Sequence, residues 1–347
     1  MRVGIAIGGS LPEVAALAGR AEAAGLESVW LAELDHSAFV QAAAAISATE
    51  RIGVGTAVAL AFPRSPTITA MTAWDLDEMS GDRFMLGLGP QVKRVMEARF
   101  SVSVEKPAPQ MREYVQALRT VWAANRGEPV VHEGESYKIT MPTFHGQPRP
   151  ERRDTPILLA AVGPLLSRVC GEVADGLLGH PLASPRYLRE AVAPAIATGL
   201  ERSGRPSGAC PISAMVMVSV GHDEVAARRA ARRQIAFYAT TPSYRPILAM
   251  HGRGALPRDL RRAFVNHDQD LMASLIDDEL LDAIAIAGRP DEALDRLRAW
   301  EGVAERVILG VPWYGMTPDR LRGAIEAALD LGSHLADTTR RRERDRA

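Results

Sequence analysis

The chain has 347 residues, a length that fits either two average domains or one large α/β barrel. Apolar residues make up 47% of it and charged residues 24%, which supplies enough apolar material for a core and excludes wholesale disorder. Its 41 Lys and Arg nearly balance its 42 Asp and Glu, leaving a formal charge of -1. A near-neutral chain has no general attraction for nucleic acid or an anionic membrane, so we expect neither as a partner.

The cysteines and the apolar segments bear on metal binding and location. Cys170 and Cys210 have no Cys or His near them at the spacing of a zinc site, so we expect no metal and no disulfide framework. No segment reaches the roughly 18 apolar residues of a membrane span, and the N-terminal residues lack a signal-peptide pattern. We therefore expect a cytoplasmic protein.

Short apolar runs alternate with helical patterns from the first residues onward. The apolar runs, which predict strands, cover residues 3–7, 28–31, 52–58 and 83–88. The helical spacing of apolar residues covers 12–24, 39–49 and 68–79. Strands joined by crossover helices lie parallel, so this half of the chain predicts either an open doubly wound sheet or a closed barrel.

The same alternation continues through the second half, with two interruptions. Further strands are predicted at 157–160, 176–178, 212–220 and 307–311. Further helices are predicted at 111–125, 165–174, 187–202, 225–238 and 321–331. The stretch 127–154 is typical of an inserted hairpin and loop, and 241–286 of a helical excursion.

The count of β–α units is eight, which favours a TIM barrel over a Rossmann sheet of five or six strands. We predict one barrel domain over residues 1–335, with insertions at about 127–154 and 241–282. Residues 336–347 are predicted to form a charged, solvated tail.

In such a barrel the loops after the strands carry the chemistry, and the loop after the second strand contains His36. A neighbouring carboxylate raises the pKa of histidine, so His36 beside Glu33 and Asp35 is a candidate proton donor or base. The alternative is a loop histidine that makes one structural hydrogen bond.

Other loops give weaker signals. Gly163 and Pro164 precede a predicted helix, whose first backbone amides would suit a phosphate, although a purely structural glycine fits equally well. The pair Gly87 and Gly89 indicates a close approach of two chain segments, and His180 is typical of a loop cap. The sequence contains no GxGxxG, no phosphate-loop lysine and no GxSxG, which excludes the common nucleotide-binding and serine-hydrolase motifs.

Acidic residues cluster at 267–270 and 277–279, but their spacing matches neither a calcium loop nor a zinc motif. We interpret both clusters as a solvated helical surface.

Several blocks of this sequence resemble one known family, the luciferase-like flavin and deazaflavin oxidoreductases. The blocks are AEAAGLESVW at 21–30, TERIGVGTAV at 49–58, SGDRFMLGLG at 80–89, AAVGP at 160–164 and GEVADGLL at 171–178. Shorter segments at 61–66, 73–76, 111–114 and 241–246 are similar to an actinobacterial subgroup assigned to coenzyme F420. The resemblance extends over residues 1–335.

The resemblance implies a TIM barrel that holds coenzyme F420, or alternatively FMN, at its C-terminal mouth. It implies a non-proline cis peptide between Ala57 and Val58, and a homodimer. The family's cofactor-binding positions correspond here to Asp35, His36, Thr56, Ala57, Val58, Gly89, Pro90, Gln91, Val162, Gly163, Pro164, Leu165, Gly179, His180 and Pro181.

Two positions depart from the family pattern. Ser37 and Ala38 replace an Asp-Pro pair of the subgroup, and Val92 stands where dehydrogenases of the family carry an acidic residue. His36 is therefore the main proton-handling candidate, with Glu33 or Asp35 to orient it.

We expect an oxidoreductase in which reduced F420 delivers a hydride from ring carbon C5 to an electron-poor C=C, C=N or C=O of a small organic substrate. His36 would protonate the neighbouring atom. The alternatives are an FMN monooxygenase supplied with reduced flavin by a partner reductase, and a non-catalytic flavin-binding barrel. The residues expected to face the substrate are Phe62, Arg64, Phe144, Tyr244, Arg245 and His251.

Overall fold

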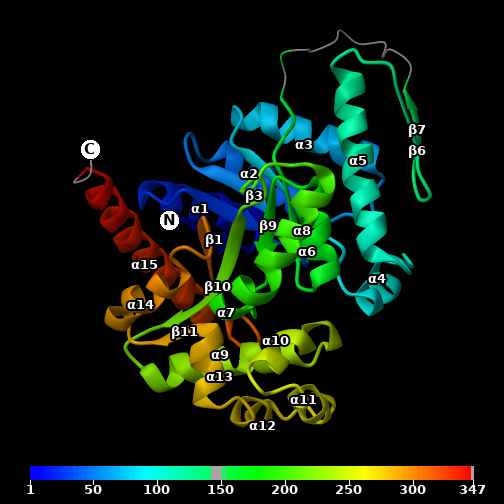
Figure 1. The fold of residues 1–347 in the computed structure, drawn as a ribbon. Helices are drawn as coiled ribbons and strands as arrows, with labels where there is room; N and C mark the ends of the chain where they lie inside the picture. The colour runs from blue at the N-terminus through cyan, green and yellow to red at the C-terminus, as the bar shows by residue number, and fades with distance from the viewer. Residues whose placement is uncertain (142–150, 152, 345–347) are drawn as a thin grey trace.

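The computed structural model describes residues 1–141, 151 and 153–344, and it confirms the predicted barrel (Figure 1). Eight parallel strands close into a ring in the order β10, β12, β1, β2, β3, β5, β8 and β9, with β9 pairing back onto β10. Their bounds are β1 Arg2–Ile7, β2 Ser28–Leu31, β3 Gly53–Thr56, β5 Phe84–Gly89, β8 Ile157–Ala161, β9 Gly176–Gly179, β10 Ile212–Val220 and β12 Arg306–Gly310.

Two short strands were not predicted. β11 (Ala285–Gly288) pairs with the C-terminal half of β10, in a stretch expected to belong to the helical excursion. The strand expected at 52–58 ends at Thr56, and β4 (Ala59–Leu60) pairs with β5 after it. Between the two pieces, the Ala57–Val58 peptide bond is cis, as the family resemblance implies.

Helices cover the outside of the barrel, and those predicted are present. They are α1 Leu11–Ala23, α2 Ala38–Ser47, α3 Pro66–Ser80, α5 Pro107–Asn125, α6 Pro164–Val173, α7 Pro185–Tyr187 with a π-helical turn at Leu188–Val192, α8 Ala193–Ser203, α9 Glu224–Ala239 and α15 Pro318–Arg344. Because α15 runs to Arg344, most of the predicted tail is helical. Two further helices, α4 (Lys93–Phe100) and α14 (Pro290–Leu297) with a 3-10 turn at Arg298–Trp300, were not predicted. Within the described residues, no helix combines the length and the apolar character that crossing a membrane requires.

Both predicted insertions are present. The first contains the hairpin of β6 (Val130–Glu133) and β7 (Lys138–Met141), which lies on the side of α5 that faces away from the barrel (Figure 1). Residues 142–150 and 152 of this insertion, with Phe144 among them, lie outside the described residues. The second insertion consists of a 3-10 turn at Pro242–Tyr244, α10 Arg245–Met250, α11 Leu256–Val265, α12 Gln269–Ser274 and α13 Asp278–Ile284.

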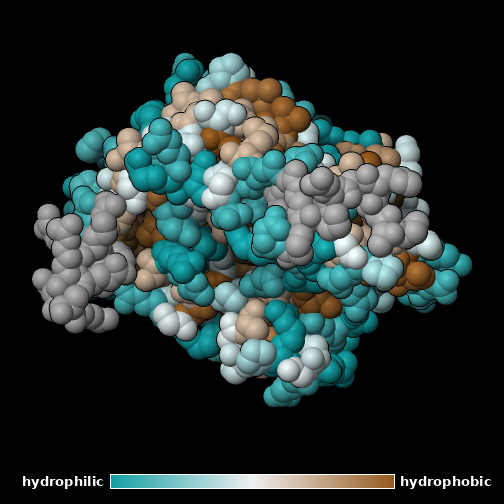
Figure 2. All heavy atoms as spheres, turned by 90° about the horizontal axis from the view of Figure 1, so that it is seen from above, coloured by the Kyte–Doolittle hydropathy of each residue, from teal (hydrophilic) through white to brown (hydrophobic). Residues whose placement is uncertain are grey.

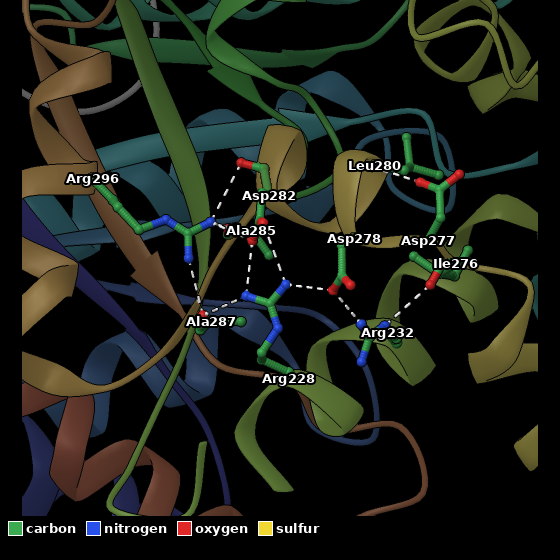
Figure 3. A network of polar contacts seen from close by, with 10 residues as sticks. All are labelled: Arg228, Arg232, Ile276, Asp277, Asp278, Leu280, Asp282, Ala285, Ala287 and Arg296. Atoms are coloured by element: carbon green, nitrogen blue, oxygen red, sulfur yellow. Dashed lines mark hydrogen bonds and ion pairs between the residues drawn. The ribbon is translucent and has the colours of Figure 1, made fainter. Parts of the chain in front are cut away.

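The acidic clusters tie this second insertion to the barrel. Asp277 caps α13 by accepting the Leu280 N–H at 2.9 Å. Asp278 and Asp282 both accept hydrogen bonds from Arg228 of α9, as Figure 3 shows. The clusters are thus engaged in helix caps and ion pairs. In the part of the chain that the structure describes, no group of three His, Cys, Asp or Glu side chains could hold a metal ion.

A single tryptophan fills much of the barrel interior. Trp30 is fully buried and packs with Leu158, Leu178 and Ile308. A Cβ atom at Gly55 would lie 2.5 Å from Cζ3 of Trp30, so the indole requires glycine on the adjacent strand. This explains why neighbouring strands carry glycines at inward-facing positions.

The N-terminal end of the barrel is closed by a charged floor. Arg306 donates hydrogen bonds to the Glu27 carboxylate at 2.8 and 2.9 Å and to Ser213 Oγ at 3.0 Å. Its guanidinium lies 5.5 Å from the centre of the Trp30 ring. These contacts of Arg306 occupy the N-terminal end of the barrel, opposite the loops that follow the strands.

Candidate active site

Small side chains line the mouth of the barrel above Trp30. Ala6, Ala57, Val58 and Ala160 are partly buried and pack against the Trp30 cluster. The Ala57 N–H donates to the Leu31 carbonyl at 2.7 Å, and the Val58 carbonyl accepts from the Glu33 N–H at 3.2 Å. The backbone at the cis peptide is thus fixed to the neighbouring strand, and the small side chains leave room above it for a flat apolar ring.

Thr56 joins two strands just below this surface. Its buried hydroxyl donates to the Gly87 carbonyl at 2.7 Å and accepts the Gly87 N–H at 2.9 Å. A Cβ at Gly87 would lie 1.8 Å from the Thr56 carbonyl oxygen, and one at Gly89 would lie 2.6 Å from Cγ2 of Val58. The close approach predicted for the two glycines is confirmed. The Thr56 side chain is engaged in this pairing, and the residue as a whole is fully buried, so its role in the structure is to join the two strands.

Glu33 and Arg64 form a largely buried ion pair. The Glu33 side chain is 7% exposed, and it accepts hydrogen bonds from the Leu60 N–H and the Arg64 guanidinium, both at 2.8 Å. The Arg64 guanidinium lies 5.2 Å from the centre of the Phe39 ring. The two charges neutralise each other and hold the loop after β4. Among the described residues, neither side chain makes a contact that bears on the predicted roles of Glu33 beside His36 and of Arg64 as a receptor for a substrate anion.

His36 and Asp35 lie in the exposed loop between β2 and α2. Asp35 is 95% exposed and lies 3.7 Å from the Arg99 guanidinium of α4. Gln41 donates to the Ala32 carbonyl at 2.9 Å and to the His36 carbonyl at 3.5 Å, which positions the loop backbone. Among the described residues, no side chain forms a hydrogen bond with the His36 ring, so both ring nitrogens are open to a ligand or to water.

The start of α6 presents free backbone donors to open space. Gly163 is the N-cap, no side chain caps this helix, and Pro164 begins it. The N–H groups of Leu165 and Leu166 belong to the first turn, where α-helices leave their donors without intrahelical partners. Apart from Gly163 and its two chain neighbours, no atom of the described residues lies within 4 Å of the place where a Gly163 Cβ would stand. Free donors, the positive helix end and open space together make a suitable seat for a phosphate.

The other predicted loop residues also reach the mouth. Gln91 follows β5 with a φ of 57° and accepts the Val92 N–H through its side-chain oxygen at 3.0 Å. The Val162 carbonyl accepts a hydrogen bond from the Tyr187 hydroxyl at 3.0 Å. Pro90 and Pro181 are both partly exposed.

His180, at the end of β9, is surrounded by aromatic rings. Its ring centre lies 4.2 Å from that of Tyr244 and 4.8 Å from that of Tyr238. Burial lowers the pKa of His180 to about 3, so the imidazole is neutral at physiological pH. Its Nδ1 accepts the Leu182 N–H at 3.1 Å, which places the remaining ring proton on Nε2.

Sequence reasoning missed four residues of this aromatic group: Phe237 and Tyr238 of α9, and the pair Trp313 and Tyr314 after β12. The backbone N–H groups of the pair donate to the Gln234 side-chain oxygen at 2.9 and 2.8 Å. Phe237 of α9 stacks on Tyr314 with 4.3 Å between ring centres. Trp313 and Tyr314 closely follow the last strand of the barrel, so the rule that strand-following loops carry the site would have selected them.

The remaining substrate candidates lie in different environments. Phe62 is buried and packs edge-on against Tyr114 of α5, with 6.4 Å between ring centres. Arg245 is exposed at the start of α10. His251 Nε2 lies 2.9 Å from Ser184 Oγ, within hydrogen-bonding distance. Of the predicted set with described coordinates, only Tyr244 contacts the aromatic group at the mouth.

The sequence profile of the luciferase-like monooxygenases matches residues 3–304. The chain belongs to this family. Its closed eight-stranded barrel and its cis peptide at Ala57–Val58 agree with the resemblance drawn from the sequence.

Several members of the family are similar to this chain over most of its length. An uncharacterised protein of Mycobacterium tuberculosis is 43% identical over 86% of this chain and 91% of its own. The 5,10-methylenetetrahydromethanopterin reductase of Methanolobus tindarius is 31% identical over 82% of this chain and 85% of its own. The structure of the coenzyme F420-dependent tetrahydromethanopterin reductase of Methanopyrus kandleri superposes with a TM-score of 0.79 at 25% identity, covering 96% of this chain and 97% of that one.

Proposed function

We propose that this member of the family is an F420-dependent oxidoreductase that reduces an electron-poor C=C, C=N or C=O of a small organic substrate. Two of the similar proteins named above are reductases, and one of them is described as F420-dependent. The observation that best supports the proposal is the arrangement of residues at the mouth of the barrel. There, a surface of small side chains lies beside the unpaired backbone N–H groups at the start of α6.

The residues at the mouth fit such a cofactor. The Leu165 and Leu166 amides and the open space at Gly163 suit its phosphate. Ala57, Val58 and Ala160 offer an apolar floor for its ring. The loops with Asp35 and His36, with Gly89 to Gln91, and with Gly179 to Pro181 follow strands of the same barrel, and we expect them to surround this apolar surface.

The bound cofactor, in its reduced form, supplies the hydride for the substrate. One atom of the substrate double bond takes the hydride, and the other takes a proton, so the substrate gains two electrons and two hydrogens. His36 supplies that proton from its open ring nitrogen and regains one from water. The neutralised Glu33–Arg64 pair keeps the loop below the ring in place without a net charge there.

The seat at α6 can be tested with one substitution and a matched control. Gly163→Asp places a carboxylate on the Leu165 and Leu166 amides, where it caps the helix and repels a phosphate. We expect F420 to bind at least roughly tenfold more weakly to this variant, because a charge-assisted contact is worth about 1.5–3 kcal/mol. Titration of each purified protein, followed by F420 fluorescence, measures the effect.

The control is Ala255→Asp, which adds a carboxylate at the uncapped N-terminus of α11, another helix with an early proline. Its affinity for F420 should equal that of the unchanged protein, and neither variant should lose thermal stability. Equal F420 affinities in all three proteins would show that α6 does not hold the phosphate.

The same titration with FMN separates the two cofactor hypotheses. Preference for F420 over FMN supports the reductase, whereas tight FMN binding with weak F420 binding supports the two-component monooxygenase. A protein that binds F420 and never reoxidises its reduced form with any unsaturated substrate would be a binding protein.

We also propose that the chain forms a homodimer through α2 and α3. Val40 of α2 and Ile68, Met71 and Met79 of α3 each expose about half of their surface, between 50% and 54%. Seen from above, the molecule is mostly hydrophilic, with hydrophobic side chains gathered in a patch at the upper edge of the view (Figure 2). Exposed apolar groups that cluster on neighbouring helices are typical of an interface.

A further inference from the structure

The rim of the barrel mouth has two unlike sides. The loops after β2, β3, β5 and β8, as far as the next strand or helix, supply small apolar residues, Gly163 and a few polar side chains, and their described residues contain no aromatic ring apart from that of His36. The other side, formed after the neighbouring strands β9, β10 and β12, supplies aromatic rings. We call these rings the aromatic wall; they belong to His180, Phe237, Tyr238, Tyr244, Trp313 and Tyr314.

The rings of the aromatic wall touch one another in a continuous series. Tyr238 lies 6.4 Å from both Tyr244 and Trp313, edge to face in each case. Phe237 links this part to Trp313 at 5.3 Å. Trp313 is 38% exposed, whereas the other four tryptophans of the chain are at most 7% exposed. An aromatic surface that stays open beside a candidate active site is typical of a ligand subsite.

The chemistry of the aromatic wall selects its ligand. None of its side chains is charged at neutral pH, because burial also raises the pKa values of Tyr238 and Tyr244. The Nε2–H of His180 has no hydrogen-bond partner among the described residues. The aromatic wall thus combines flat π surfaces with one fixed donor.

A cationic ligand would also be attracted to aromatic faces, but the N–H of His180 presents the positive end of its dipole to it. A carbonyl oxygen accepts a hydrogen bond from the same group. The donor therefore favours a neutral ligand with an acceptor over a cation.

We propose that the aromatic wall binds the substrate, and that the substrate is an uncharged, planar, conjugated carbonyl compound whose oxygen accepts a hydrogen bond from His180 Nε2. This inference rests on the proposed function, because it assigns the side of the mouth with small residues to the cofactor and the aromatic side to the substrate. It moves His180 from the predicted cofactor residues to the substrate residues.

The naphthoquinone menadione is a suitable probe, since it is uncharged, planar and quenches tryptophan emission. Trp313 is the exposed tryptophan, so saturable quenching by menadione reports binding at the aromatic wall. Titrations are made with the free protein and with F420 added in excess. Trp313→Phe should abolish the quenching while calorimetry still detects binding.

Two substitutions test the contacts, and one serves as the control. His180→Phe keeps a ring and removes the donor, and Tyr244→Leu removes a ring face. Each should weaken menadione binding roughly three- to tenfold, the effect of one hydrogen bond or one ring pair. Tyr137→Leu changes a partly buried tyrosine of the outer hairpin and should leave menadione binding unchanged.

The outcomes separate this inference from the proposed function. Benzyltrimethylammonium, an aromatic cation, should compete weakly or not at all, and tighter binding of this cation than of menadione overturns the substrate class. If F420 binds and menadione does not saturate, or if all three variants behave alike, the inference is wrong and the reductase proposal stands. If F420 does not bind and menadione does, with the expected losses, the inference stands and the proposed function is wrong.

Discussion

At the scale of single residues, Trp30 and Gly55 show how one large side chain constrains its neighbours. The indole is fully buried, with its N–H bonded to Ser28 Oγ at 2.9 Å, so it has no room to move away from an added methyl group. A Cβ at Gly55 would stand 2.5–2.9 Å from three carbons of that ring.

We expect Gly55→Ala to destabilise the protein by about 1–3 kcal/mol, the usual cost of overpacking a core. Urea unfolding followed by circular dichroism measures the change. Gly323→Ala is the control, because Gly323 lies inside α15 with open space around it. That variant should gain about 0.5–1 kcal/mol from helix propensity. Equal stabilities for Gly55→Ala and the unchanged protein would mean that the barrel interior can relax.

His180 makes the stability depend on pH in a defined direction. Burial lowers its pKa from 6.5 to about 3, so between these values the unfolded chain binds a proton that the folded chain does not. Stability therefore falls as the pH falls through this window, by at most about 1.4 kcal/mol per pH unit for one proton. His180→Phe should flatten the dependence between pH 6.5 and 4. Parallel slopes for both proteins in urea titrations would contradict a buried neutral imidazole.

At the scale of elements, the sequence predicted those whose apolar pattern is strong. All eight barrel strands and the long amphipathic helices were predicted, because a short apolar run and a stretch of helical spacing recur in each unit. β11 was missed because its four residues, Ala-Ile-Ala-Gly, directly follow α13 and offer too short a pattern. α4 was missed because, of its eight residues, only Met96 is buried, so it lacks an apolar stripe.

Ion pairs between α9 and α13 help to hold the second insertion against the barrel. Arg228, whose side chain is 19% exposed, bonds Asp278 and Asp282 together, and Arg296 bonds Asp282 from α14 (Figure 3). We expect Arg228→Leu to destabilise this region by about 1 kcal/mol and to speed hydrogen exchange in α13 and β11. Arg298→Leu removes an exposed pair, 62% and 74% exposed, and should change neither quantity. Equal exchange rates in both variants would show that apolar contacts alone hold the insertion.

At the scale of the whole molecule, the barrel could be predicted from the sequence. The loops on one side of its mouth could also be named from the sequence as candidates for binding a cofactor. Gly163 before α6 and the glycines within β5 could be singled out from the sequence, because glycine at these places suits a helix start that faces a phosphate or a close approach of two chain segments. The Glu33–Arg64 pair could not be foreseen, since it joins side chains from two loops whose separation only the folded barrel sets. The aromatic wall was missed for a similar reason, because its rings come from four separate segments of the chain.

The proposed dimer can be tested by charge insertion at its centre. Met71→Glu should convert the homodimer to a monomer, because a carboxylate in an apolar interface loses its hydration. Val225→Glu, at a site 77% exposed on α9, is the control and should not change the assembly. Sedimentation at several concentrations measures the mass. A monomeric unchanged protein, or a dimeric Met71→Glu variant, would exclude this interface.

Because the indole of Trp30 fills much of the barrel interior, it limits which substitutions this sequence can accept during evolution. Gly55 is excluded from gaining a side chain while Trp30 is present, since an added Cβ would lie 2.5 Å from its ring, and an added Cβ at Gly4 would lie 2.5 Å from Ser28 Oγ and 3.0 Å from Trp30 Nε1. Replacing Trp30 alone leaves a void that neither glycine fills. Descendants of this chain can therefore alter the interior only by compensated exchanges, in which a smaller residue on β2 arrives together with a larger one on a neighbouring strand. The side chains inside the barrel must therefore change together, whereas the loops at its mouth can change independently and accommodate a different ligand.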